Sequence, residues 1–410
     1  MTIRMDRLVR SIAVALDIVE GELLGATTNH GKRIATLCTI MARRFGLPEL
    51  YISELTTCAL FHDSALTESE AMPCHCEIGQ RNIELLPMKT DVSGFVLYHH
   101  EHADGSGVFG KHEGEYPLGA ELIAISDMLD VEYHLQRAQN LEVLHRRVEQ
   151  DPRFTKRASE AMLPVLNNVV MEMLRDENID ETATWLIPMW NIDAKDAALI
   201  KVSQLFAHII DYKSKFTRVH TDQIANRAWL MGEYYGYTLE QKVQLYLAAA
   251  LHDIGKLATP TEILEKPGKL TDEEFIIIKR HVLHTQEILK GVEGLEEISA
   301  WAGNHHEKLD GTGYPQGLKS SSLDFNSRLL ACIDIYQAVS EARPYHAQRA
   351  HEETMPIMYQ MAERGFIEPV IVRDMDEAMK PYSMLEMPKP CYEMRNNADR
   401  RSGFDRRELL

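Results

Sequence analysis

The stretch that decides the fold is HDIGK at residues 252–256, because its His-Asp pair occurs earlier in the chain as His62-Asp63. A further histidine precedes each pair, His30 in the first half and His220 in the second, and 31 residues separate it from the pair both times. Matched spacing of this kind indicates an internal duplication. We therefore expect the two halves of the chain to share one fold.

The correspondence continues beyond the His-Asp pairs. His75 aligns with His281, the pair 99–100 (His-His) with 305–306 (His-His), and Asp127 with Asp334. The offset between the halves changes from 190 to 206 residues because the second half carries an extra segment at about residues 257–275. Five histidines and two aspartates thus recur in the same order.

The periodicity of the apolar residues predicts helices in both halves. Ile34 and Met41 fall on one helical face, as do Ile224 and Met231. Gly46 and Gly236 each follow the first histidine by sixteen residues, where a left-handed cap would end a helix. No stretch alternates as a strand would. We expect an all-α fold of two tandem bundles with a helical connector, divided as residues 1–150, 151–195 (connector), 196–385 and 386–410 (basic C-terminal tail).

Composition excludes several classes of partner. The 410 residues include 62 acidic and 44 basic side chains, a net charge of −18. A DNA-coating protein neutralises phosphates with many Lys and Arg side chains, so no DNA partner is expected. No apolar run approaches the roughly 20 residues that span a bilayer, so we expect a cytoplasmic protein with no membrane partner. A homodimer stays open.

The recurring residue types suit a pair of metal ions. Neutral imidazoles and carboxylates bind first-row divalent ions, and one Asp can bridge two of them. Fe or Mn is favoured over structural Zn, whose sites are closed and four-coordinate. Two such ions lower the pKa of a water between them and hold phosphate oxygens during hydrolysis. The sequence lacks a Walker motif, a dinucleotide-binding glycine fingerprint and a serine-hydrolase elbow, so the chemistry predicted is phosphoester hydrolysis.

The second half resembles the HD-GYP phosphodiesterases. The similarity lies in HDIGK at 252–256, KPGKLT at 266–271, HHEKLDGTGYP at 305–315 and RPY at 343–345, and it covers about residues 196–385. The first half resembles an HD domain that lacks the GYP signature. The resemblance implies a helical fold and a metal-dependent phosphodiesterase that opens a cyclic dinucleotide, cyclic di-GMP or 3′,3′-cyclic GMP-AMP, by attack of a bridging hydroxide on phosphorus.

The resemblance also implies roles for individual residues. One ion would be held by His220, His252, Asp253 and Asp334, and the other by Asp253, His281, His305 and His306. Asp253 and Lys256 are the expected catalytic residues, and the expected substrate contacts are Lys256, Gly313, Tyr314, Pro315 and Arg343. Two ions are favoured over three, because Phe216 stands where some members have a Glu ligand. Gln337 and His346 depart from the family pattern, which leaves the base preference and the final product open.

The first half keeps the ligand types but not the other motifs. Its seven candidate ligands for a second metal site are His30, His62, Asp63, His75, His99, His100 and Asp127. Leu66 occupies the position of Lys256, and Gly107-Val108-Phe109 replaces Gly-Tyr-Pro. We therefore expect a regulatory or structural role for this half. Two alternatives stay open for the chain: a catalytically weak cyclic-dinucleotide receptor that acts through partner contacts, and oxidative di-iron chemistry in the first half.

Overall fold

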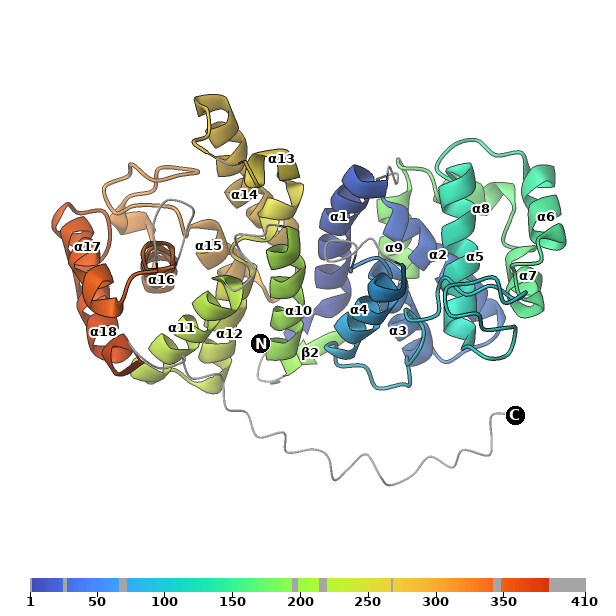
Figure 1. The fold of residues 1–410 in the computed structure, drawn as a ribbon, viewed down its shortest axis with the longest axis horizontal. Coiled ribbons are helices and arrows are strands. Elements are labelled where there is room, and N and C mark those ends of the chain that lie inside the picture. The colour runs from blue at the N-terminus through green and yellow to red at the C-terminus, as the bar shows by residue number, and fades with distance from the viewer. Residues whose placement is uncertain are drawn as a thin grey trace, which may run out of the picture.

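The computed structural model describes residues 2–24, 28–65, 72–193, 198–213, 220–266, 268–341 and 348–382. Helices dominate these residues, and they gather into two bundles that lie side by side (Figure 1). The predicted all-α class is therefore confirmed. The expected C-terminal tail, residues 386–410, lies outside the described residues.

The first bundle is built around α2 and α5. Its helices are α1 (Met5–Leu24), α2 (His30–Arg44), α3 (Glu49–Leu60), α4 (Met72–Glu84), α5 (Leu118–Tyr133) and α6 (Leu141–Gln150). The segment expected to connect the bundles forms α7 (Lys156–Met162), α8 (Asn168–Met173) and α9 (Ile179–Leu186). Because α7 packs against α5 and α9 packs against α2, these short helices cover the first bundle.

The second bundle repeats the main helices of the first. Its elements are α10 (Ala198–Lys213), α11 (His220–Tyr234), α12 (Leu239–Leu251), η1 (Ile254–Ala258), α13 (Thr261–Leu264), α14 (Asp272–Leu289), α15 (Glu296–Gly303), η2 (Ser320–Ser322), α16 (Phe325–Ser340), α17 (His351–Glu363), α18 (Pro369–Met379) and η3 (Lys380–Tyr382). The helices α2 and α11 have equal lengths, as do α5 and α16. Gly46 and Gly236 adopt φ of 68° and 66° after α2 and α11, so the predicted left-handed caps are confirmed.

Two short strands were not expected from the sequence. β1 (Thr2–Arg4) pairs antiparallel with β2 (Asn191–Asp193), with Ile3 opposite Ile192. Three residues are too few to show the alternating pattern by which strands are recognised. The pairing brings the beginning of the described chain to the segment that precedes α10.

The two bundles share one apolar core, and α1 lies where they meet. This helix packs against α2 and α3 of its own bundle and against η1 and α14 of the other. The backbone N–H of Arg4 donates to the carbonyl of Glu293 at 3.1 Å. Phe61, directly before the first His-Asp pair, stacks on Phe206 of α10 with ring centroids 6.2 Å apart. The first bundle therefore contacts α10 of the second bundle and also η1 and α14, which follow the second His-Asp pair.

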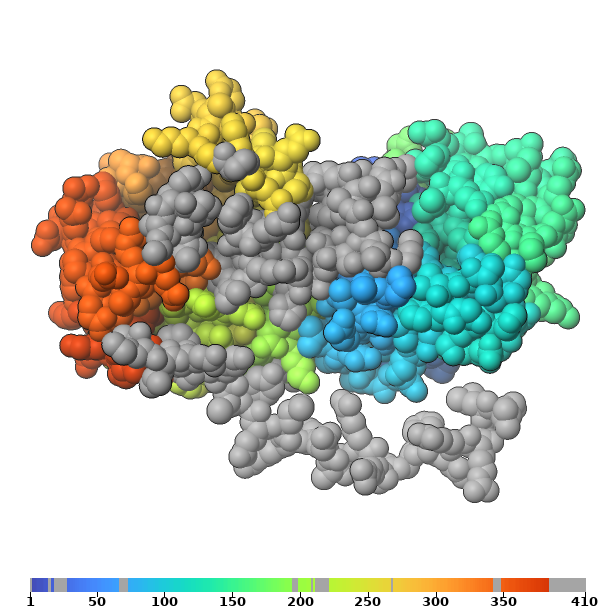
Figure 2. Space-filling model, in the orientation of Figure 1, coloured from blue at the N-terminus to red at the C-terminus, as the bar shows by residue number. Residues whose placement is uncertain are grey.

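The extra segment of the second half ends at a well-formed helix start. The sequence Thr271-Asp272-Glu273-Glu274 predicts a capping box, with Thr and Glu three residues apart. Thr271 accepts a hydrogen bond from the backbone N–H of Glu274, whose carboxylate accepts one from the N–H of Thr271, so this prediction is confirmed. In the space-filling view, the segment around α13 and the start of α14 projects from the surface (Figure 2).

The second His-Asp pair is fixed by close packing of η1 on α14. α12 is buried along most of its length and ends at Leu251, with His252 as its C-cap. Gly255 donates its N–H to the Thr285 hydroxyl at 3.0 Å, and this hydroxyl donates to the carbonyl of His252, also at 3.0 Å. A Cβ on Gly255 would lie 1.9 Å from the carbonyl oxygen of His281. Only glycine therefore permits this approach.

Thr285→Val should destabilise the metal-free protein by about 1–3 kcal/mol, because the shape is kept while a buried N–H and a buried carbonyl lose their partner. Urea denaturation followed by circular dichroism measures the change. Thr184→Val is the matched control, since the Thr184 hydroxyl donates to a helix carbonyl at the exposed surface. Equal midpoints for the two variants would show that the Thr285 hydroxyl does not hold η1 in place.

Candidate metal centre

The cluster in the second bundle is centred on Asp253, whose side chain is 4% exposed. Asp253 Oδ1 lies 3.2 Å from His281 Nε2 and 3.9 Å from His305 Nε2, while Oδ2 lies 3.2 Å from His252 Nε2. Two ligand atoms on one ion are themselves about 3 Å apart when each metal bond is about 2.1 Å. The spacing therefore fits a carboxylate that bridges between imidazoles and cations.

Two further ligand candidates complete the cluster. Asp334, from α16, places Oδ1 3.8 Å from His252 Nε2 and Oδ2 3.7 Å from His306 Nδ1. The ligand atoms of His252, Asp253 and His305 all lie within 4.8 Å of one another, and so do those of His281, His305 and His306. His305 belongs to both groups. The arrangement thus offers two overlapping positions for a cation.

Backbone hydrogen bonds point the imidazoles inward. His252, His281 and His305 each donate Nδ1–H to the backbone carbonyl three residues earlier, at 2.7, 2.6 and 2.6 Å. A carbonyl can only accept, so Nδ1 carries a proton and Nε2 is the nitrogen that can bind a metal. This second hydrogen bond is what fixes the orientation of a metal-binding imidazole.

The electrostatics also suit a cation. Burial by itself raises the pKa of Asp253, but the charges of His252 and Lys256 outweigh it and hold that pKa well below its usual range. Burial and the neighbouring His306 hold the pKa of His305 well below its usual range. The buried Asp253 Oδ1 accepts no hydrogen bond. A charged carboxylate and a neutral imidazole are the forms that bind divalent first-row ions, so the residues fit the expected metal.

Lys256 and Tyr314 lie at the edge of this cluster. Lys256 Nζ, on η1, is 2.5 Å from Asp253 Oδ2. The Tyr314 ring lies 4.8 Å from the His306 ring, and Lys279 Nζ lies 5.4 Å from the Tyr314 ring centroid. A cation and an aromatic face are thus presented beside the ligand set. Lys279 was not expected from the sequence, because it belongs to none of the motifs, although it lies only two residues before His281.

The loop that carries Tyr314 is held by a buried carboxylate. Glu307 accepts hydrogen bonds from three backbone N–H groups, those of residues 316–318. A Cβ on Gly313 would lie 2.4 Å from the backbone nitrogen of Lys308, so glycine is required there. The adjoining Tyr314-Pro315 peptide bond is cis. The path of this loop is therefore fixed through its own backbone groups and not through the side chains that the loop displays.

Some predicted residues cannot be placed. The backbone of His220 begins α11, but its side chain lies outside the described residues, as do Arg343, His346, Phe216 and Leu66. Gln337 is fully buried, donates to Gln223 Oε1 at 3.0 Å and accepts a hydrogen bond from Arg227. Sequence reasoning missed these two partners, because nothing in a linear motif shows which side chains meet across helices.

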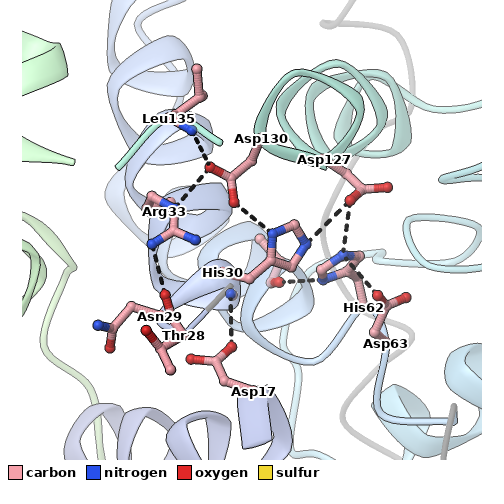
Figure 3. A network of polar contacts seen from close by, with 12 residues as sticks. Asp17, Thr28, Asn29, His30, Arg33, His62, Asp63, Asp127, Asp130 and Leu135 are labelled. Atoms are coloured by element: carbon pink, nitrogen blue, oxygen red, sulfur yellow. Dashed lines mark hydrogen bonds and ion pairs between the residues drawn. The ribbon is translucent and has the colours of Figure 1, made fainter. Parts of the chain in front are cut away.

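The first bundle assembles its own cluster around Asp63. Asp63 Oδ1 lies 2.9 Å from His75 Nε2 and 3.6 Å from His99 Nε2, and Oδ2 lies 3.5 Å from His62 Nε2. Figure 3 shows His30 and His62 both facing Asp127, at 3.2 and 3.8 Å from its Oδ1. The loop after this cluster repeats the second half, with Glu101 accepting the N–H groups of residues 109 and 111.

Comparisons with known proteins relate this chain to HD domains and to phosphodiesterases of cyclic dinucleotides. Residues 204–371 match the HD domain family. The chain is 39% identical over 194 residues to 3′3′-cGAMP-specific phosphodiesterase 1 of Vibrio cholerae, covering 46% of this chain and 45% of that protein. It is 27% identical over 334 residues to 3′3′-cGAMP-specific phosphodiesterase 3 of the same organism, covering 80% and 72%. A cyclic di-GMP phosphodiesterase of Thermotoga maritima is 35% identical over 160 residues, 38% of this chain and 43% of that protein.

A solved structure supports the fold of both bundles. The crystal structure of the cyclic GMP-AMP phosphodiesterase V-cGAP3 of V. cholerae covers 93% of this chain and 98% of its own, with a TM-score of 0.63 and 20% identity. Among the helices that the structure describes, none combines the length and apolarity needed to cross a membrane. The alignment with the first relative spans less than half of that protein. Residues 204–371 thus match the HD domain family, and the resemblance to HD-GYP phosphodiesterases that the motifs predict is confirmed by these relatives.

Proposed function

We propose that the second bundle, residues 196–385, is a metal-dependent phosphodiesterase that hydrolyses a cyclic dinucleotide, either cyclic di-GMP or 3′,3′-cyclic GMP-AMP. Curated relatives of this chain are named as phosphodiesterases of these compounds. Both candidates are small anions with two phosphodiester groups and two purines. A site for them needs cations for phosphate and an apolar or aromatic surface for a base.

One observation carries the proposal: Asp253 joins three inward-facing imidazoles to Lys256 beside the loop of Tyr314. The imidazoles and Asp334 would hold two divalent ions, Fe or Mn by ligand type. The chemistry that such a pair supplies is a lowered pKa for a water and neutralised phosphate oxygens. Without Lys256 and the loop, the same ligands would support metal binding alone.

The side chains of this chain have separable tasks in the proposed reaction. Lys256 places an ammonium group at the centre, where charge builds up on a phosphate oxygen in the transition state. The Tyr314 ring offers a face for a purine, with Lys279 over that ring. Gly313 lets the loop pack against the backbone of residues 306–308, and it stays a predicted substrate contact. Arg343 stays a predicted phosphate contact.

The first bundle has a supporting role in this proposal. α1 packs against η1, which carries Lys256, and against α14, which carries His281. Movement of the first bundle would therefore act on two residues of the proposed centre. We assign residues 1–150 and 151–195 to this regulatory or structural unit, and residues 386–410 to a basic tail outside it.

Asp253→Asn should remove both metal and turnover from the second bundle, because the amide keeps the size of the carboxylate but not its charge. The protein is reconstituted anaerobically with Fe²⁺ or Mn²⁺ and offered cyclic di-GMP and 3′,3′-cyclic GMP-AMP, and the products are separated by chromatography. Asp272→Asn, at the exposed start of α14, is the control and should behave as the wild type. Wild-type protein that binds a dinucleotide without repeated turnover would favour the receptor alternative instead.

Lys256→Ala should keep its metal and lose turnover by roughly 100-fold or more, the usual effect of deleting one electrostatic donor. The loss is expected in kcat rather than in metal content, which atomic emission spectroscopy of the same sample reports. The control is Lys242→Ala, since Lys242 lies over the Trp229 ring and pairs with Glu233. An unchanged kcat in Lys256→Ala would remove this residue from the reaction.

A further inference from the structure

We propose that Asp130, paired with Arg33, orients His30 as a ligand of the metal centre that the sequence predicts in the first bundle, whereas the second bundle has no carboxylate at this position. The ions that these side chains would bind are divalent first-row ions. The centre is independent of hydrolysis in the second bundle, because it uses a separate set of side chains. The matched family segment, residues 204–371, does not include it.

The ligand atoms fall into two groups that share one carboxylate. His30, His62 and Asp63 form one group, and Asp63, His75, His99 and His100 form the other, with all ligand atoms in each group within 4.8 Å of one another. Asp127 adds a carboxylate to the first group, 3.2 Å from His30 Nε2. Each group therefore has four donor residues, and the shared Asp63 matches the position that Asp253 has in the second bundle.

Several of these donors are buried without a hydrogen bond. Among the residues that the structure describes, His62 Nε2, His99 Nε2 and both ring nitrogens of His75 find no hydrogen-bond partner, and all three side chains are at most 1% exposed. His75 Nε2 comes within 2.9 Å of Asp63 Oδ1 but is not aligned to donate to it. Burying a polar atom without a partner is unfavourable. Cations between the Nε2 atoms and Asp63 would satisfy these Nε2 atoms.

The imidazoles are oriented as ligands here too. His62 and His99 donate Nδ1–H to the backbone carbonyl three residues earlier, at 2.9 and 2.5 Å. His30 instead donates Nδ1–H to Asp130 Oδ2 at 2.7 Å, which leaves Nε2 facing Asp127 (Figure 3). A carboxylate behind a ligating imidazole fixes its tautomer and makes it a stronger donor to the metal.

Asp130 is itself held in place by a buried ion pair. Its side chain is fully buried, and Oδ1 accepts from Arg33 Nε at 2.8 Å and from the N–H of Leu135 at 3.2 Å. Arg33 also donates to the carbonyl of Thr28 at 2.8 Å. These hydrogen bonds and the burial of both side chains keep the pair in one arrangement.

The second bundle shows that this ion pair is not needed for the fold. The positions that correspond to Arg33 and Asp130 are Gln223 and Gln337, which bond to each other through neutral amides. Arg227 donates to Gln337 there, so the second bundle keeps a guanidinium at these amides but no carboxylate. Burying a carboxylate in an ion pair is costly, and stability alone seldom favours it. The first bundle therefore keeps the charged pair for what it does to His30, which is to strengthen a metal ligand.

This centre is suited to holding ions rather than to cleaving a phosphodiester. The sequence places Leu66 where the second half has Lys256, and Val108-Phe109 where it has Tyr314-Pro315. A phosphate would thus meet no equivalent ammonium group. Ions here would hold together α2, α3, α4 and α5, which carry or precede the ligands, and so stabilise the bundle that contacts η1.

Metal content distinguishes the two centres. Full-length protein is loaded anaerobically with Mn²⁺, freed of excess metal and analysed by atomic emission spectroscopy. Asp63→Asn and Asp253→Asn should each keep about half of the wild-type metal, and the double variant should keep almost none, because metal binding requires the deprotonated ligand set. His75→Gln is a second variant of the first centre, should Asp63→Asn fold poorly. Full metal content in both first-bundle variants would overturn the proposal.

The role of Asp130 is tested on an Asp253→Asn background, where only the first centre remains. Arg33→Gln with Asp130→Gln installs the neutral pair of the second bundle without leaving a buried charge alone. Affinity for Mn²⁺, from competition with a chelator, should fall roughly 10- to 100-fold, the usual effect of losing such a carboxylate. Unfolding of the metal-free protein, measured beside it, should change little. Unchanged affinity would show that Asp130 does not position His30.

Discussion

The constraint on which both clusters depend is a short hydrogen bond from an imidazole to the main chain. In five histidines, His62, His99, His252, His281 and His305, Nδ1–H donates to the carbonyl three residues earlier. The ring then has one tautomer and one direction, and Nε2 faces the shared Asp. Because the acceptor belongs to the backbone three residues earlier, the orientation follows from the local path of the main chain and tolerates change in the surrounding side chains.

The duplication gives the chain two copies of this arrangement with different surroundings. In the second copy, Lys256 contacts the shared Asp253, while Gln337 donates to Gln223 and accepts a hydrogen bond from Arg227. In the first copy, Asp130 with its partner Arg33 lies behind His30. The second copy thus has an ammonium group beside the shared Asp, and the first has a carboxylate behind a ligand. The same helices can accordingly serve reaction in one bundle and retention of ions in the other.

The sequence predicted the helical class, the caps at Gly46 and Gly236 and the capping box of α14, because these features depend on neighbours a few residues apart. It missed the pairing of β1 with β2, which are too short to show a pattern. It also missed Arg33 with Asp130 and Gln223 with Gln337, since each pair lies about 100 residues apart and meets only when α2 packs on α5 or α11 on α16. The ligand sets themselves were proposed from order and spacing, and the structure brings their described members together.

The carboxylates of Glu101 and Glu307 hold the loops beside the two clusters by accepting hydrogen bonds from backbone N–H groups of those loops. A loop held in this manner keeps its path whatever side chains it displays, apart from the glycines at 107 and 313 that the tight packing demands. The side chains that such a loop presents to a ligand can therefore be substituted while the hydrogen bonds that hold its backbone remain. Divergence after the duplication could therefore proceed one residue at a time, with Gly-Tyr-Pro in one copy and Gly-Val-Phe in the other on a common frame.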